Sequence, residues 1–404
     1  MYLRLCSNPI VTNLCLRLAV LGFLALSLLP APAQFTLDRE PMGPSSRKTG
    51  LVITEIFYNP RLLPGLATNQ TVEFIEIYNS KPWPEQIGGY TVRSTADSAA
   101  DGVSAYTFET NAVLSPKSYL VIARVPDLVK VEYGIENVVG PWIGAETNRL
   151  SRERGVVQLL NRQGAVLLSI DYQDSPPWPE AADGAGHSLS LVRPSYGEGD
   201  FRAWAESDSI GGSPGVAEPL TQEPLAPVVI NEWQNHSDPE DWIELYNHSN
   251  AAIDLSGAWL SDDPLTNKYR IPNGTSIPAR GFLSWSQSQL GFELFAGGET
   301  IFFWNASQTR VLDVIDFRGQ SNNITSGRFP DGGPLTYGLR NGTRGGPNSP
   351  PMRYPVVISE IMYNPISGNA DDEYIEIYNR GNLPVNLAGW EFVLASTTPS
   401  PPTR

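Results

Sequence analysis

The stretch Val72-Glu-Phe-Ile-Glu-Ile-Tyr-Asn79 decides the fold, because close matches to it occur at three places in the chain. It returns as Asp241-Trp-Ile-Glu-Leu-Tyr-Asn247 and as Glu373-Tyr-Ile-Glu-Ile-Tyr-Asn379. Successive residues of a strand point to opposite faces, and this stretch carries apolar side chains on both faces. That pattern is typical of a central or sandwiched strand. The sequence therefore predicts one such strand in each of three copies.

Two further patterns accompany this strand in a fixed order. The pattern before it lies at residues 51–56, 228–233 and 356–361, and the pattern after it lies at residues 87–90, 255–259 and 387–390. Three ordered matches found three times indicate repeats of one module. The long period favours a separate domain for each repeat over a turn of a solenoid.

The composition agrees with an all-β protein of two or three domains. The chain has 404 residues, with 36 Gly and 35 Pro that punctuate short strands and turns. In the first module we predict a hairpin through residues 161–164 and one short helical turn at Pro126–Tyr133. The net charge of −15 argues against a nucleic-acid partner, because a nucleic-acid groove needs a basic face.

Residues 1–33 have the features of a signal peptide. Arg4 and Arg17 supply positive charge, residues 18–29 are apolar, and residues 31–33 fit a small-residue cleavage site. The apolar run is shorter than the roughly 20 residues that a spanning helix needs. We therefore expect export without a membrane span after signal removal, with a signal anchor as the alternative.

Both cysteines of the chain, Cys6 and Cys15, lie inside the predicted signal. The mature chain would then contain no disulfide, which fits a bacterial secreted or cell-envelope protein better than an animal ectodomain. We predict linkers at residues 34–50 and 217–227, where Pro and polar residues prevail. The predicted domains are a first sandwich with insertions at 51–216, a second at 228–348 and a truncated third at 356–404. The third lacks the closing strands of the others, so we expect the chain to be a fragment or its reading frame to be lost near Val393.

These patterns together resemble the lamin-tail domain family. The resemblance rests on Val-Ile-x-Glu, Ile-Glu-Ile/Leu-Tyr-Asn, Leu-x-Gly-x-Trp, a Gly-Gly-Glu strand opening and a terminal Gly-x-Pro-Asn, and it covers residues 51–348 and 356–393. The first module departs from it in its insertions and in Glu153-Arg-Gly155, which replaces the Gly-Gly-Glu opening. The resemblance implies tandem immunoglobulin-like β-sandwiches. It also implies accessory modules on exported bacterial proteins, often beside hydrolase, nuclease or spore-coat-kinase-like domains, with no catalytic residues to carry over.

A pair of glutamates recurs in every copy. The pairs are Glu55 with Glu76, Glu232 with Glu244, and Glu360 with Glu376. Two carboxylates on neighbouring strands could form a glycosidase pair or a metal site. Their repetition with the fold favours the other interpretation, in which each glutamate accepts hydrogen bonds from nearby backbone or side chains and fixes the strand register.

Acidic loops precede the central strand in two copies. The candidate calcium ligands are Asp238, Glu240, Asp241, Asp371 and Asp372. Clusters of carboxylate oxygens suit Ca²⁺, although neither loop follows an EF-hand pattern. A solvated loop without an ion is the alternative, and the first module has no acidic residue there before Glu73.

No motif of an enzyme is evident, and we predict neither catalytic residues nor a cofactor other than calcium. His187, His236 and His248 are the only histidines, without the spacing of a zinc site, and no phosphate-binding loop occurs. Six tryptophans are candidates for stacking on sugar rings, with core packing as the alternative. They are Trp83, Trp142, Trp178, Trp204, Trp285 and Trp304, with Trp178 in Ser175-Pro-Pro-Trp-Pro179 the best surface candidate.

Three functions are compatible with this sequence. The first is a secreted, non-catalytic binding or spacer protein whose partner is a protein or a cell-surface glycan. The second is the N-terminal accessory region of an exported enzyme whose catalytic domain would follow Arg404. The third, a refinement of the first, is a calcium-dependent glycan-binding module.

Overall fold

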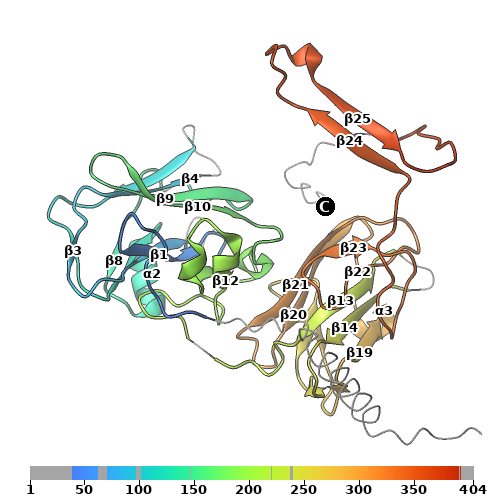
Figure 1. Cartoon of the computed structure of the whole chain (residues 1–404). Coiled ribbons are helices and arrows are strands. Elements are labelled where there is room, and N and C mark those ends of the chain that lie inside the picture. Colours follow the sequence, from blue (N-terminus) through green and yellow to red (C-terminus); the bar gives the residue numbers. More distant parts are fainter. Residues whose placement is uncertain are drawn as a thin grey trace, which may run out of the picture.

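A computed structural model describes residues 39–61, 71–96, 102–145, 147–219, 221–236, 240–390 and 392. The predicted signal peptide lies outside these residues. The regular secondary structure of the described residues is mainly β-strand, and the first two copies each form a β-sandwich (Figure 1). In the described part of the chain, none of the helices has the length and apolar character needed to cross a membrane.

The first module consists of two main sheets. One has the strand order β12-β11-β1-β2-β7-β8 and the other the order β10-β9-β4-β5. The strands of the first sheet are β1 (Leu51–Phe57), β2 (Phe74–Asn79), β7 (Tyr119–Ala123), β8 (Val138–Val139), β11 (Leu189–Leu191) and β12 (Trp204–Glu206). Those of the second are β4 (Thr91–Thr95), β5 (Val103–Thr107), β9 (Arg154–Leu160) and β10 (Val166–Gln173). The module also contains the small sheet of β3 (Glu85–Gln86) and β6 (Val113–Leu114), helix α2 (Pro126–Tyr133), and the 3-10 turns η1 (Glu180–Ala182), η2 (Pro194–Tyr196) and η3 (Phe201–Ala203).

The second module has the same topology. Its sheets have the orders β19-β14-β13-β22-β23 and β17-β16-β20-β21, which are the first module's orders read from the other end, without β8. The strands are β13 (Val228–Gln234), β14 (Trp242–Asn247), β15 (Ile253–Asp254), β16 (Trp259–Ser261), β17 (Tyr269–Arg270), β18 (Ser276–Ile277), β19 (Phe282–Ser286), β20 (Gly298–Trp304), β21 (Val311–Arg318), β22 (Ser326–Arg328) and β23 (Thr336–Gly338), and the helix is α3 (Gln287–Leu290). Matching connectivity confirms that the two copies share one fold.

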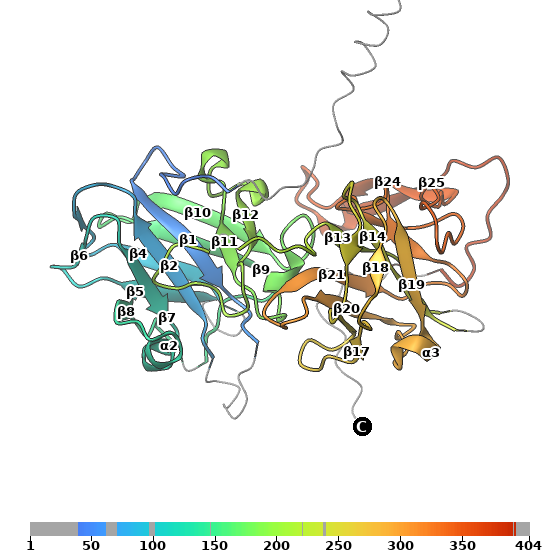
Figure 2. The ribbon, with the colours of Figure 1, turned by 90° about the horizontal axis from the view of Figure 1, so that it is seen from below.

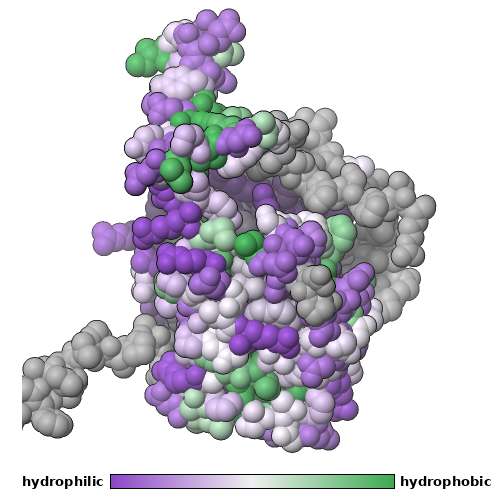
Figure 3. Space-filling model, turned by 90° about the vertical axis from the view of Figure 1, so that its right-hand side faces the viewer, coloured by the Kyte–Doolittle hydropathy of each residue, from purple (hydrophilic) through white to green (hydrophobic). Residues whose placement is uncertain are grey.

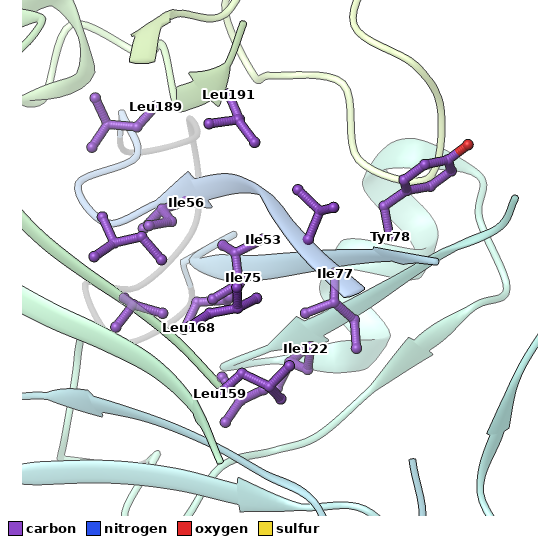
Figure 4. Close-up of a cluster of buried hydrophobic side chains, with 14 of the residues drawn as sticks. Ile53, Ile56, Ile75, Ile77, Tyr78, Ile122, Leu159, Leu168, Leu189 and Leu191 are labelled. Atoms are coloured by element: carbon purple, nitrogen blue, oxygen red, sulfur yellow. The ribbon is translucent and has the colours of Figure 1, made fainter. Parts of the chain in front are cut away.

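The core of the first module lies between its two sheets. Ile75 and Ile77 of β2 are buried with Leu159 of β9 and Leu168 of β10 (Figure 4). On the other face of β2, Phe74 joins a second buried cluster that includes residues of α2. The central strand thus has buried apolar residues on both faces, as its sequence predicts. The short helix and the hairpin of β9 and β10 are also confirmed.

The repeated residues outside the core define the turns. The Asn79 side chain donates to the carbonyl oxygens of Trp83, Leu114 and Ser115, at 2.9, 3.1 and 3.1 Å. Asn247 makes the equivalent three hydrogen bonds in the second module. In the third repeated pattern the first and fourth residues form a hydrogen-bonded turn in every copy. Its glycines (Gly89, Gly257 and Gly389) have φ angles of 76°, 81° and 81°, which explains why glycine recurs there.

The third copy is an exposed hairpin. Strands β24 (Val356–Met362) and β25 (Tyr374–Asn379) pair with each other, and η4 (Ala370–Asp372) lies in the loop between them. Apolar side chains that are buried in the other copies are exposed here and gather on the hairpin at the top of Figure 3. They include Ile358, Ile361, Ile375 and Ile377. The two strands of this hairpin therefore pair in the same register as the equivalent strands of the complete modules, but their apolar side chains are not buried.

Candidate functional site

A β-bulge brings the two repeated glutamates together in every copy. In the first module the register of β1 against β2 shifts between Ile53 and Glu55, which places Glu55 directly opposite Glu76. The same shift places Glu232 opposite Glu244 and Glu360 opposite Glu376. Without the extra residue, each pair would be offset by one position and would point to opposite faces.

In the first module, both glutamates hold the loop that closes the domain. Glu55 accepts hydrogen bonds from the Ser213 N–H at 3.0 Å and from the Ser188 hydroxyl. Glu76 accepts from the Gly215 N–H at 2.5 Å and from the Thr54 hydroxyl at 2.6 Å. The two carboxylates therefore join the loop to the central strands.

The second module repeats this arrangement with different residues. Glu232 accepts from the N–H and the hydroxyl of Thr343, at 3.0 and 2.9 Å. Glu244 accepts from the Gly345 N–H. The donors again belong to a Gly-rich loop after the last strand, and in both modules the glutamates are almost completely buried.

Burial raises the pKa of these glutamates, because it disfavours the charged carboxylate. It raises the pKa of Glu76 to about 8 and that of Glu244 to about 8, and the pKa of Glu55 also lies well above its usual range. In Glu55 the neighbouring Glu76 adds to this effect, while the hydrogen bonds from Ser188 and Ser213 act against it.

These contacts agree with the interpretation that the glutamates fix the fold. Sequence reasoning placed the pairs on the central strands but missed the loop that donates to them. The signal was present in the Gly- and Pro-containing segments at residues 211–215 and 345–348, which mark the end of each complete module. In the third copy Glu360 and Glu376 are exposed, and they accept hydrogen bonds from Tyr374 and Ser359 within the same hairpin.

The structure describes four of the five predicted calcium ligands, since Asp238 lies outside the described residues. Glu240 accepts from the Ser288 N–H at 3.0 Å and Asp241 from the Leu294 N–H at 3.2 Å. Asp371 and Asp372 lie in the exposed turn η4 of the third copy. Among the described residues no group of three or more His, Cys, Asp or Glu is arranged to hold a metal ion. Calcium binding stays a prediction.

The prediction of Trp178 as a surface residue is wrong. Its side chain is 7% exposed and packs against Trp204, with 6.3 Å between the ring centroids. Four other candidates for sugar stacking are also buried: Trp142, Trp204, Trp285 and Trp304. Of the six, only Trp83 is exposed, and Lys81 lies over its ring. The Pro-rich segment around Trp178 folds onto the module and buries the indole, which its local sequence does not indicate.

The family model of the Lamin Tail Domain matches residues 44–174, 221–344 and 350–401, which together make up more than half of the chain. The chain belongs to the lamin-tail domain family. This assignment confirms the resemblance seen in the sequence. Because each of the two complete copies also forms a β-sandwich, each is an immunoglobulin-like lamin-tail module.

Other comparisons add little to this assignment. No protein of curated function matches the chain. Among solved structures, similarity is found to an exo-chitosanase of Amycolatopsis orientalis, with 10% identity over 62% of this chain and 26% of that one, and a TM-score of 0.15. A second structure, of the exo-beta-D-glucosaminidase with an inhibitor, has 11% identity over 61% of this chain and 25% of that one, with the same TM-score. At this score the likeness carries no argument about fold or function.

The first two lamin-tail modules contact each other along strand β21. Figures 1 and 2 show them side by side, with β21 on the side of the second module that faces the first. This strand is the edge of its sheet, so its outer backbone groups need partners from elsewhere. The first module supplies partners at the start of β21 and at Thr309 just before it. The Val311 N–H donates to Nε2 of His187 at 2.9 Å, and the Ile210 N–H donates to the Thr309 carbonyl at 2.9 Å.

His187 is fully buried at this contact and is held as a neutral ring. Since Nε2 accepts a hydrogen bond, Nδ1 carries the proton and donates to the Ser207 carbonyl at 2.8 Å. Burial, together with the nearby Arg310, lowers the pKa of His187 to about 4, while the hydrogen bond with Ser207 acts against this shift. Arg310 pairs with Asp208 at 2.9 Å, and both side chains are at most 10% exposed.

An apolar cluster completes the contact between the lamin-tail modules. Ala181 and Ala185 of the first module are buried against side chains of β20 and β21 in the second, which include Phe302, Trp304 and Val314. Such burial contributes about 25 cal/mol per Å² of apolar surface removed from water. Apolar packing, edge hydrogen bonds and a buried ion pair thus occur in one interface.

Proposed function

We propose that this chain is an exported, non-catalytic binding and spacer protein in which the first two lamin-tail modules act as one rigid body. The observation that carries the proposal is the contact along β21. Inter-domain contacts that are small and polar allow domain motion, whereas a large and apolar contact restricts it. Here the contact contains an apolar cluster, and His187 and Ile210 take part in hydrogen bonds along the edge of β21.

Two other observations support the non-catalytic and exported parts of the proposal. The repeated glutamate pairs, which are the strongest candidates for acid–base chemistry in the sequence, accept hydrogen bonds from backbone groups of the closing loops. The apolar run at residues 18–29, followed by the small residues 31–33, supports export. A spacer that holds its modules at a fixed angle would present their outer surfaces to a protein or a cell-surface glycan.

Distance measurements between spin labels test the rigid arrangement. The mature chain expected here contains no cysteine, so labels can be attached at Glu109→Cys in the first module and Asn273→Cys in the second, both of which are exposed positions. We expect one narrow distance distribution. The further changes His187→Ala and Arg310→Ala remove an acceptor for β21 and the ion pair with Asp208, so the distribution should broaden.

A matched control keeps the contact intact. Arg154→Ala removes an exposed ion pair with Asp171 within the first module, so the distribution should stay narrow. A broad distribution in the labelled chain that has no interface mutation would refute the rigid body. An unchanged narrow distribution in the double interface mutant would show that these two residues do not hold the modules together.

A further inference from the structure

We propose that a hollow in the second module binds a sugar ring of a neutral glycan. The hollow has a volume of about 410 Å³ and lies between the end of β21, the loop that follows it, the β22–β23 hairpin and the segment leading to the third copy. We call it the Trp233 hollow. Its lining includes Trp233, Arg318, Gln320, Tyr337 and Tyr354. Its volume falls within the range of about 300–1,000 Å³ that is usual for small-ligand sites.

Two of the residues that line the hollow each carry a buried polar atom without a partner. Trp233 is 1% exposed, and within the described residues its indole N–H has no hydrogen-bond acceptor. The side-chain oxygen of Gln320 is also buried and lacks a donor there. A buried polar group left unpaired costs about 1–3 kcal/mol, so a ligand that displaces the atoms covering these two groups and pairs with both gains that free energy. A hydroxyl group can do so, because it donates one hydrogen bond and accepts others.

Two tyrosines that line the same hollow are partly exposed to solvent. Tyr337 is 38% exposed and Tyr354 is 55% exposed. An aromatic ring with an apolar face and a polar end suits a surface that is partly apolar and partly wet. The C–H faces of a pyranose ring provide the apolar side of such a contact, and its hydroxyls provide the polar side. The combination of exposed rings and unpaired polar groups is thus typical of a site for a hydroxylated ring.

The charges around the hollow favour a neutral ligand. Asp316 and Arg318 both line it, with opposite charges, and Thr300 donates to the Asp316 carboxylate at 3.2 Å. A phosphorylated or sulfated ligand would meet one arginine and one carboxylate, in a protein with a net charge of −15. An uncharged sugar meets no such repulsion.

This inference deepens the binding part of the proposed function and rests on it. The glycan site and the module contact share strand β21, because Asp316 lines the hollow and its backbone also donates a hydrogen bond to Glu180 of the first module. His187 and Arg310, the residues changed in the spin-label experiment, do not line the hollow. Loss of glycan binding would therefore leave the rigid two-module body in place, and a flexible module contact would leave the Trp233 hollow unchanged.

Titration of the full chain with soluble hexasaccharides tests the site. The probes are cellohexaose, chitohexaose and xylohexaose, followed by calorimetry and by tryptophan fluorescence. We expect at least one of them to bind with a dissociation constant of about 1 mM or lower. Tyr354→Ala and Tyr337→Ala should each weaken binding by about tenfold or more, which corresponds to 1.4 kcal/mol. Trp233→Phe keeps the ring and removes the N–H, and should also weaken binding.

Tyr363→Ala is the matched control, because Tyr363 is an exposed tyrosine of the third copy and does not line the hollow. Its affinity should equal that of the unmodified chain. Saturable binding that falls in the hollow mutants but not in Tyr363→Ala supports the site. The absence of saturable binding of all three probes at millimolar concentration would overturn the proposal. Binding that is unaffected by both tyrosine mutations would overturn it as well, and these surface mutations decide the matter if Trp233→Phe fails to fold.

Discussion

Glu76→Ala should destabilise the first module by about 3 kcal/mol. The mutation removes the acceptor for the Gly215 N–H and the Thr54 hydroxyl, which are bound at 2.5 and 2.6 Å. Each buried donor left unpaired costs about 1–3 kcal/mol. Loss of the cost of burying the Glu76 carboxyl offsets part of this effect. For a module of this size, about 3 kcal/mol lowers the melting temperature by about 6–12 °C.

Calorimetric unfolding of the full chain measures this effect. The matched control is Glu376→Ala, which changes the equivalent glutamate of the third copy, where it is exposed. We expect the control to leave the transition of the first module unchanged. A melting temperature for Glu76→Ala that equals that of the unmodified chain would refute the view that the glutamate holds the closing loop.

We also expect the stability of the first module to depend on pH through Glu76. Burial raises the pKa of Glu76 to about 8, above the value of 4.5 expected for the unfolded chain. Its contribution to folding stability is therefore fully present below about pH 4.5 and is lost as the pH rises through about 8. Glu76→Gln cannot titrate, so the fall in melting temperature between pH 5 and 9 should become smaller. An unchanged pH profile in Glu76→Gln would show that the titration lies elsewhere.

Three other results are expected. Asn247→Ala should destabilise the second module by about 2–4 kcal/mol in chemical denaturation, because three carbonyl groups lose their donor, while Asn379→Ala in the exposed hairpin should have little effect. Sequencing of the secreted protein should give Gln34 as the N-terminal residue, and an intact N-terminus would rule out cleavage after Ala33. Calorimetric titration with Ca²⁺ tests the acidic loops, and the absence of heat at millimolar concentration would remove the calcium hypothesis.

The sequence predicted the parts of the fold that repeat. The central strands and the glutamate pairs occur three times, so coincidence could be excluded from one chain alone. The positions that sequence reasoning missed occur once or depend on distant contacts. Trp178 is buried by packing on Trp204, and the η1 segment that follows it contacts β21 more than 100 residues further along the chain. No local pattern in a Pro-rich insertion indicates such a partner.

The third copy separates what the local sequence determines from what burial adds. Its hairpin has the same bulge, the same glutamate register and the same hydroxyl donor, with Ser359 in the place of Thr54. The repeated sequence therefore places the same residues in the same register in the third copy as in the first. In the complete modules the closing loop donates to the glutamates, and burial raises the pKa of Glu76 and Glu244. The glutamate pair thus lies in the same register in every copy, and we expect stability that depends on pH in the two complete modules, where the sandwich covers it and raises the pKa of Glu76 and Glu244.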